Sequence, residues 1–166
     1  ALSQETSWLL VPVYWIGQMI GAILGAFCVW ITYRLHFQET EDPHLKLLCF
    51  STAPEIRCFR WNFLTEMIAT AVLILGVFGM ISKDNQLSPG LAPYLIGSLV
   101  IAIGLSLGGP TGYAINPARD LGPRLVYTWI YGKSHADWPY AWIPCFAPIL
   151  GSFLGYILYQ ILSCFS

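Results

Sequence analysis

One short stretch of this sequence combines a helix start at Asn116-Pro117 with a cation, Arg119, and an anion, Asp120, and could act on a solute. Asparagine is a favoured helix N-cap and proline is favoured at the first helical position, so Asn116-Pro117 predicts a helix that runs to about Trp129. If the side-chain oxygen of Asn116 caps this helix, its amide NH2 can donate a hydrogen bond outward. The helix N-terminus carries about half a positive charge, and Arg119 adds a full one. Such a site suits small neutral hydroxylated solutes and opposes cations and protons.

The stretch before this helix is expected to supply backbone acceptors. Gly112 and the glycines at 108 and 109 allow a left-handed or extended backbone whose carbonyls need not pair within the segment. At membrane depth, such carbonyls are tolerated only where they line a wet cavity. The expected helix would be about 20 Å long, which is too short for a hydrocarbon core of about 30 Å. We therefore expect a half-helix at about 117–129, preceded by a loop of hydrogen-bond acceptors.

The composition favours a membrane protein. Of the 166 residues, 56% are hydrophobic and 10% are charged, whereas a soluble domain has about 25% charged residues. The net charge of −1 argues against a nucleic-acid partner. The chain shows no pairing of a nucleophile with a base, no paired carboxylates and no phosphate-binding loop, so an enzyme is not expected.

Neither a metal nor another cofactor is expected. The five cysteines lack metal-binding spacing, and His36 and His44 lack a supporting ligand cluster. Cys49 and Cys58 could form a loop disulfide, and two separate thiols are the alternative.

Four apolar segments are long enough to be read as membrane spans, at about 8–33, 61–81, 91–108 and 140–165. Small residues four apart in the first and last spans, among them Gly17, Gly21 and Gly25, predict close helix packing. Residues 34–60 are interpreted as a solvated connector because their charges balance. Glu66 lies inside the second span, where an ionisable group indicates a functional or anchoring role.

Residues 112–125, Gly-Tyr-Ala-Ile-Asn-Pro-Ala-Arg-Asp-Leu-Gly-Pro-Arg-Leu, resemble the second signature loop of the aquaporins. The Asp that directly follows Asn-Pro-Ala-Arg resembles their glycerol-facilitator branch. The resemblance implies an all-α membrane protein, an aquaporin-like right-handed helical bundle. It further implies a single, partial channel domain over residues 1–166, with four transmembrane helices and one re-entrant half-helix, the first repeat being largely missing.

The same resemblance assigns roles to individual residues. Asn116 and Arg119 would donate to solute hydroxyls, and Tyr113 would form an apolar wall. The backbone carbonyls of Gly112, Tyr113 and Ala114 would accept hydrogen bonds from the solute. Gly104 would widen the constriction, with a helix-packing glycine as the alternative. The loop would be supported by Glu66, Asp120 and Pro117. Glu66 would accept hydrogen bonds from backbone N–H groups of the loop. Arg124 also resembles the glycerol branch, with an interfacial anchor as the alternative.

The resemblance implies a passive channel for glycerol and other small neutral polyols, with some water permeation. The protein would be a multi-pass homotetramer in the lipid bilayer of the plasma membrane. Two other interpretations stay open from the sequence. One is a non-conducting truncated subunit, and the other is a secondary transporter in which Glu66 binds an ion or relays a proton.

Overall fold

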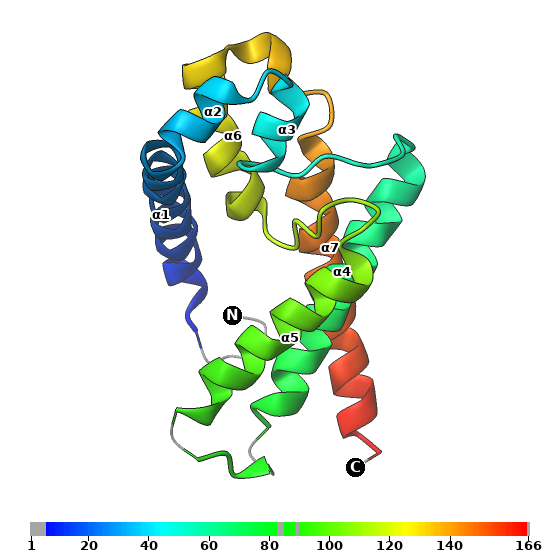
Figure 1. Cartoon of the computed structure of the whole chain (residues 1–166). Helices are drawn as coiled ribbons and strands as arrows, with labels where there is room; N and C mark the ends of the chain where they lie inside the picture. Colours follow the sequence, from blue (N-terminus) through cyan, green and yellow to red (C-terminus); the bar gives the residue numbers. More distant parts are fainter. Residues whose placement is uncertain (1–5, 83–84, 89, 166) are drawn as a thin grey trace. The chain divides into compact units, whose positions relative to one another are not determined.

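The computed structural model describes residues 6–82, 85–88 and 90–165, and every regular element in these ranges is helical (Figure 1). The longer helices are α1 (Val11–Thr32), α4 (Phe59–Met80), α5 (Leu91–Leu107), α6 (Pro117–Tyr131) and α7 (Trp142–Ser163). The short ones are η1 (Trp8–Leu10), α2 (Arg34–Glu39), α3 (Pro43–Leu48) and η3 (Lys133–His135). The all-α architecture expected from the sequence is confirmed.

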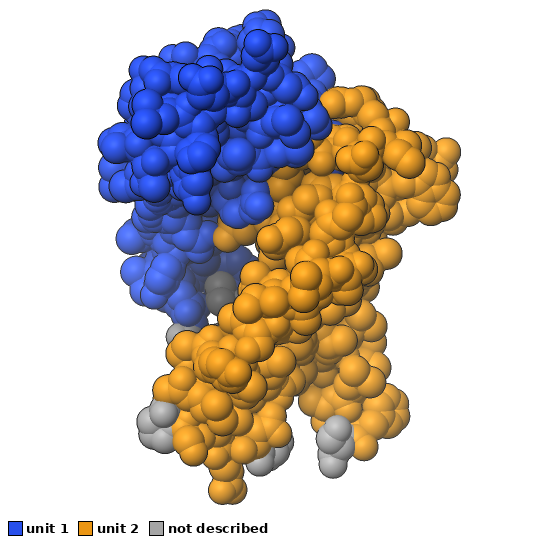
Figure 2. All heavy atoms as spheres, viewed as in Figure 1, with its two compact units in different colours: residues 1–51, 118–141 blue, residues 52–117, 142–166 orange. Residues whose placement is uncertain are grey.

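The chain divides into two compact units, coloured separately in Figure 2. The first unit comprises residues 1–51 and 118–141, and the second comprises residues 52–117 and 142–166. The signature stretch therefore contributes to both units, because the boundary falls between Pro117 and Ala118.

The first unit has an apolar core built mainly from aromatic and small residues. Its buried members are Ala26, Phe37, Leu47, Phe50, Val126, Tyr127 and Ala136. Gly122 lets α6 approach α1 closely, because a Cβ at that position would lie 2.8 Å from the Cβ of Ala22. The ring of Phe50 contacts that of Tyr127 edge-on, with 5.6 Å between the ring centroids.

Interpreting residues 34–60 as a solvated connector is wrong for its first half. That segment forms α2 and α3, and the side chain of Asp42 starts α3 by accepting a hydrogen bond from the His44 N–H at 2.8 Å. Phe37, Leu47 and Phe50 of the same segment are buried. The charged residues lie on the exposed sides of these two six-residue helices and in the turn between them, and the apolar residues Phe37, Leu47 and Phe50 fill the core.

The second unit packs α4 against α7 and α5. Backbone of α4 lies directly against two glycines of α7, since a Cβ at Gly151 would meet the Met67 carbonyl and a Cβ at Gly155 would meet the Ala71 carbonyl. This confirms the close packing expected for the small residues of the last span. In α1, by contrast, no described atom lies within 4 Å of a Cβ built at Gly17, Gly21 or Gly25. Their packing role stays a prediction.

Three helical segments in the described ranges are long and apolar enough to cross a membrane: Trp8–Thr32, Phe59–Met80 and Trp142–Ser163. The fourth expected span corresponds to α5, which is apolar but has 17 residues. At 1.5 Å per residue α5 is about 26 Å long. The half-helix expected at about 117–129 corresponds to α6, whose 15 residues extend to Tyr131.

Candidate functional site

The loop between α5 and α6 has an unusual backbone. Gly112 has φ of 81°, and two residues with side chains also have positive φ, Tyr113 at 42° and Ile115 at 48°. The left-handed conformation is routine for glycine, but it is strained for a β-branched residue such as isoleucine. Strain of this kind persists only where the surrounding structure determines the backbone strongly. The sequence anticipated left-handed backbone at the glycine and not at Tyr113 or Ile115.

Glu66 of α4 is the group that determines this backbone. Its side chain is fully buried, and its two oxygens accept hydrogen bonds from the N–H groups of Ala114 and Ile115, both at 3.0 Å. Hydrogen bonds to a carboxylate are stronger than those to a neutral acceptor. The backbone hydrogen bonds that the resemblance implied for Glu66 are present.

The same two hydrogen bonds set the direction of two carbonyl groups. In a trans peptide the C=O points opposite to the N–H of the next residue, and the described chain has no cis peptide bond. Since the N–H groups of Ala114 and Ile115 point toward Glu66, the carbonyls of Tyr113 and Ala114 point away from it. These are two of the three backbone acceptors expected from the sequence.

The start of the loop is held by further backbone contacts. The Gly112 N–H donates to the Gly108 carbonyl at 2.8 Å, and the Glu55 N–H donates to the Pro110 carbonyl at 3.1 Å. Gly112 also lies close to Thr52, whose Cβ and Cγ2 would be 3.2 Å from an added Cβ. Position 112 therefore requires glycine both for its positive φ and for this close approach.

Gly104 lies against the ring of Tyr113, and this changes its expected role. A Cβ at Gly104 would be 3.0 Å from Cζ of Tyr113 and 3.3 Å from its hydroxyl oxygen. A Cβ at Gly108 would be 2.7 Å from Cδ1 of the same ring. The missing side chain at Gly104 thus makes room for Tyr113. A wide constriction at this position remains a prediction. Gly108 also makes room for the Tyr113 ring, a role that the sequence did not indicate.

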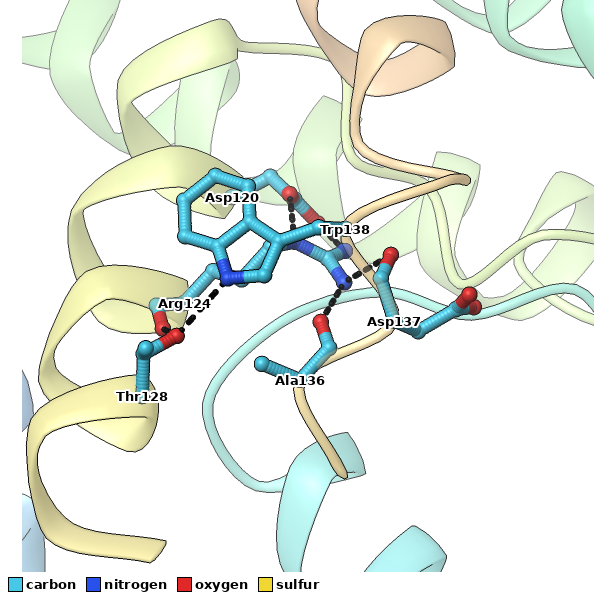
Figure 3. A network of polar contacts seen from close by, with 6 residues as sticks. All are labelled: Asp120, Arg124, Thr128, Ala136, Asp137 and Trp138. Carbon is cyan, nitrogen blue, oxygen red and sulfur yellow. Dashed lines mark hydrogen bonds and ion pairs between the residues drawn. The ribbon is translucent and has the colours of Figure 1, made fainter. Parts of the chain in front are cut away.

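In the first unit, the first turns of α6 contain a buried ion pair (Figure 3). Asp120 and Arg124 are both fully buried, and the guanidinium binds the carboxylate through two hydrogen bonds of 2.8 and 2.9 Å. Nη1 of Arg124 also donates to the carbonyls of Ala136 and Asp137, at 2.6 and 3.1 Å. An interfacial anchor would expose its guanidinium, so that alternative for Arg124 is wrong.

A second contact extends this network along α6. The Thr128 hydroxyl donates to the Arg124 carbonyl at 2.8 Å and accepts from the Trp138 indole N–H at 3.0 Å. Figure 3 shows that the network joins one face of α6 to the segment that follows it. The network fixes α6 relative to residues 136–138. The four-residue spacing of Asp120 and Arg124 could have indicated the ion pair from the sequence. Nothing in the sequence indicates that Arg124 also donates to the carbonyls of Ala136 and Asp137.

The remaining expected residues lie at the start of α6. Asn116 directly precedes this helix, Pro117 is its first residue, and Arg119 is exposed in its first turn. Asp120 also lies in the first turn, where a carboxylate is favoured by the helix dipole. Asn116 and Pro117 belong to the second unit, and Arg119 and Asp120 belong to the first.

The five cysteines are free thiols in the structure, including Cys49 and Cys58, so the disulfide alternative is not realised. No group of three or more potential metal ligands occurs among residues 6–82, 85–88 and 90–165.

Comparison with known proteins places this geometry in a family. The profile of the major intrinsic proteins matches residues 1–159. A probable glycerol uptake facilitator protein of Thermotoga maritima is 52% identical over 155 residues, which are 92% of this chain and 65% of that protein. The glycerol uptake facilitator protein of Bacillus subtilis is 49% identical over 155 residues, which are 92% of this chain and 56% of that protein. The chain thus spans 56% to 65% of the length of these two relatives.

A solved structure shares the fold. The X-ray structure of the aquaglyceroporin from Plasmodium falciparum superimposes with a TM-score of 0.87 at 27% identity, over 96% of this chain and 67% of that one. The family profile, the relatives and the shared fold agree with the signature at 112–125 and with its Glu66-anchored loop. The chain belongs to the major intrinsic protein family of integral membrane channels and transporters.

Proposed function

We propose that the protein containing this chain is a passive channel for glycerol and other small neutral polyols that also passes some water. The loop of residues 108–116 carries this proposal, because its strained backbone is held by buried Glu66. The carbonyls of Tyr113 and Ala114, directed away from that carboxylate, are acceptors for solute hydroxyls. The choice of solute is supported by the Thermotoga maritima relative, named a probable glycerol uptake facilitator, and by the Bacillus subtilis relative, named a glycerol uptake facilitator.

The donors in this proposal come from the helix that follows the loop. Asn116 and Arg119 donate hydrogen bonds to solute hydroxyls, and Arg119 and the N-terminal dipole of α6 repel cations and protons. The Tyr113 ring, seated against Gly104, is the apolar wall for the carbon chain of the solute. A polyol can contact both sides of such a pore, because its hydroxyls face the hydrogen-bonding groups while its CH groups face the apolar wall.

The contacts of Glu66 favour a passive channel over an ion-coupled transporter. A coupling carboxylate must bind an ion or gain and lose a proton during transport. Both oxygens of Glu66 accept backbone hydrogen bonds, and the side chain has no exposed surface. We therefore assign Glu66 to holding the loop.

We also propose a homotetramer in the plasma membrane. Several helices present large apolar side chains, such as Leu105 of α5, which is 86% exposed. Apolar surface of this kind is covered by lipid or by other subunits. Chemical crosslinking in intact membranes, resolved by mass, tests the subunit number, and crosslinked species that stop at the dimer would contradict a tetramer.

The solute assignment is tested by swelling of proteoliposomes that contain the full-length protein. An inward glycerol gradient should cause re-swelling much faster than in empty vesicles, at a rate unchanged by sodium or proton gradients. Re-swelling at the rate of empty vesicles would refute the channel and support a non-conducting subunit. Re-swelling that requires an ion gradient would support a coupled transporter.

A further inference from the structure

A cavity of about 340 Å³ lies within the first unit, beside the end of α1 and the short helices α2 and α3. Its volume is in the range of about 300–1,000 Å³ found for ligand pockets. Most of its wall is apolar, with Val29 on α1, Phe37 on α2 and Leu45 on α3 among the lining residues. None of the residues discussed for solute passage lines it.

The polar groups of this cavity give it a positive character. Lys46 and His36 line it, and its described lining residues include no carboxylate. The Lys46 ammonium lies 5.4 Å from the centroid of the Tyr131 ring, a contact that holds the cation against α6. The nearby carboxylate of Asp42 does not line the cavity and is directed to the start of α3, where its Oδ1 accepts a hydrogen bond from the His44 N–H. An anion with an attached hydrocarbon chain fits this combination of apolar wall and cation.

The sequence around the cavity places it at a membrane surface. The apolar segment Trp8–Thr32 ends directly before it. Trp30 and Tyr33 occur at that end, and the guanidinium carbon of Arg34 lies 4.5 Å from the centroid of the Trp30 ring. Aromatic and basic residues concentrate at the level of lipid headgroups.

Two leucines beside the cavity also indicate lipid contact. Leu35 on α2 is 73% exposed and Leu45 on α3 is 54% exposed. Short helices that expose leucines next to cations are typical of segments that lie in the membrane interface. A water-soluble anion would leave these leucines uncovered, whereas a lipid covers them.

We propose that this cavity binds an anionic phospholipid. The phosphate lies at Lys46, and the first part of an acyl chain lies against Val29, Phe37 and Leu45. Recognition rests on the negative headgroup together with the chain, so a zwitterionic phospholipid and inorganic phosphate are both poorer ligands.

Native mass spectrometry of the full-length protein in detergent tests the proposal, with phosphatidylglycerol, phosphatidylcholine and inorganic phosphate as separate probes. Phosphatidylglycerol should be retained best, and Lys46→Gln should lower its affinity about fivefold. Arg60→Gln is the matched control, because it removes one exposed positive charge outside the cavity. Equal losses in both variants, or equal retention of the two lipids, would overturn the proposal. Inorganic phosphate that displaces the lipid would overturn the role of the acyl chain.

Alkylation of cysteines locates the bound lipid without any substitution. Cys49 lines the cavity and Cys58 does not, and both are accessible thiols. Phosphatidylglycerol should slow the reaction of Cys49 with N-ethylmaleimide, measured by peptide mass spectrometry, and leave Cys58 unchanged. A lipid that protects neither thiol, or both equally, does not occupy this cavity. This measurement decides the question if Lys46→Gln fails to fold, and it is independent of whether the protein conducts glycerol.

Discussion

Replacing Glu66 by glutamine tests the central contact of the loop with the smallest change in shape. The carboxylate receives two backbone N–H groups at 3.0 Å in a site from which water is excluded. A glutamine side chain offers one oxygen acceptor and one NH2 donor. One of the two N–H groups, at Ala114 or Ile115, must then face a donor and lose its hydrogen bond.

The cost follows from these contacts. A buried donor without a partner costs about 1–3 kcal/mol, and the surviving bond weakens because its acceptor is no longer charged. We expect Glu66→Gln to lower the free energy of unfolding by about 2–4 kcal/mol. The left-handed conformations of Tyr113 and Ile115 cost about 1–3 kcal/mol each, so the loop should relax once one anchor is lost.

Stability is measured by denaturant unfolding in detergent, and glycerol flux by proteoliposome swelling. Both should fall in Glu66→Gln, with flux falling even where the variant is still folded. Glu55→Gln is the matched control, since the Glu55 side chain is exposed and only its backbone N–H contacts the loop. If the two variants behave alike in both assays, the hydrogen bonds of Glu66 do not hold the loop.

Four further results are expected. Gly104→His should crowd the Tyr113 ring, because a Cβ at position 104 would lie 3.0 Å from Cζ of that ring. Glycerol flux should fall about tenfold while water flux is retained. An unchanged ratio of glycerol flux to water flux in swelling assays would contradict this. Arg119→Ala should increase proton or cation leak, seen with a pH-sensitive dye inside vesicles, since a full charge near a low-dielectric pore is worth several kcal/mol. Arg124→Ala leaves Asp120 buried without its partner and should cost about 3–5 kcal/mol in denaturant unfolding. Asp120→Leu with Arg124→Met removes both charges and takes the Arg124 donor away only from the Ala136 and Asp137 carbonyls, so it should cost less. Burial raises the pKa of the Cys49 thiol, so its thiolate is scarce at neutral pH and alkylation should rise about tenfold per pH unit up to that raised pKa; a rate that levels off below pH 8.5 would contradict it.

The sequence predicted well those features that depend on neighbouring residues. Asn116-Pro117 located the start of α6 because capping and the fixed φ of proline act within one turn. The length of α6 followed from the same local pattern. Glu66 was recognisable because a carboxylate among apolar residues needs partners. The family resemblance placed these partners in the loop before α6, and the structure identifies them as the N–H groups of Ala114 and Ile115, 48 and 49 positions away.

Features that depend on distant partners were missed or misread. Residues 34–50 looked like a charged connector, yet Phe37, Leu47 and Phe50 are buried with residues of α6 about 80 positions away. Gly104 was expected to widen a constriction or to pack against a helix, whereas the structure places the ring of Tyr113, a residue with positive φ, against it. No local rule predicts positive φ for tyrosine or isoleucine, because the strain is compensated by contacts from another helix.

Glu66 and the Asp120–Arg124 pair each fix the backbone of a segment next to Asn116 in the sequence. In the second unit, Glu66 holds the backbone just before this residue, and in the first unit, the Asp120–Arg124 pair holds the helix just after it. Apolar residues of similar volume often give equal or greater stability than a buried ion pair. Apolar residues cannot accept hydrogen bonds from two N–H groups, as the strained loop requires of Glu66. Nor can they donate to two carbonyls, as the segment beside α6 requires of Arg124. We therefore infer that these charges are retained because they specify backbone geometry. An apolar pair in place of Asp120 and Arg124 should accordingly preserve the free energy of unfolding better than it preserves glycerol flux.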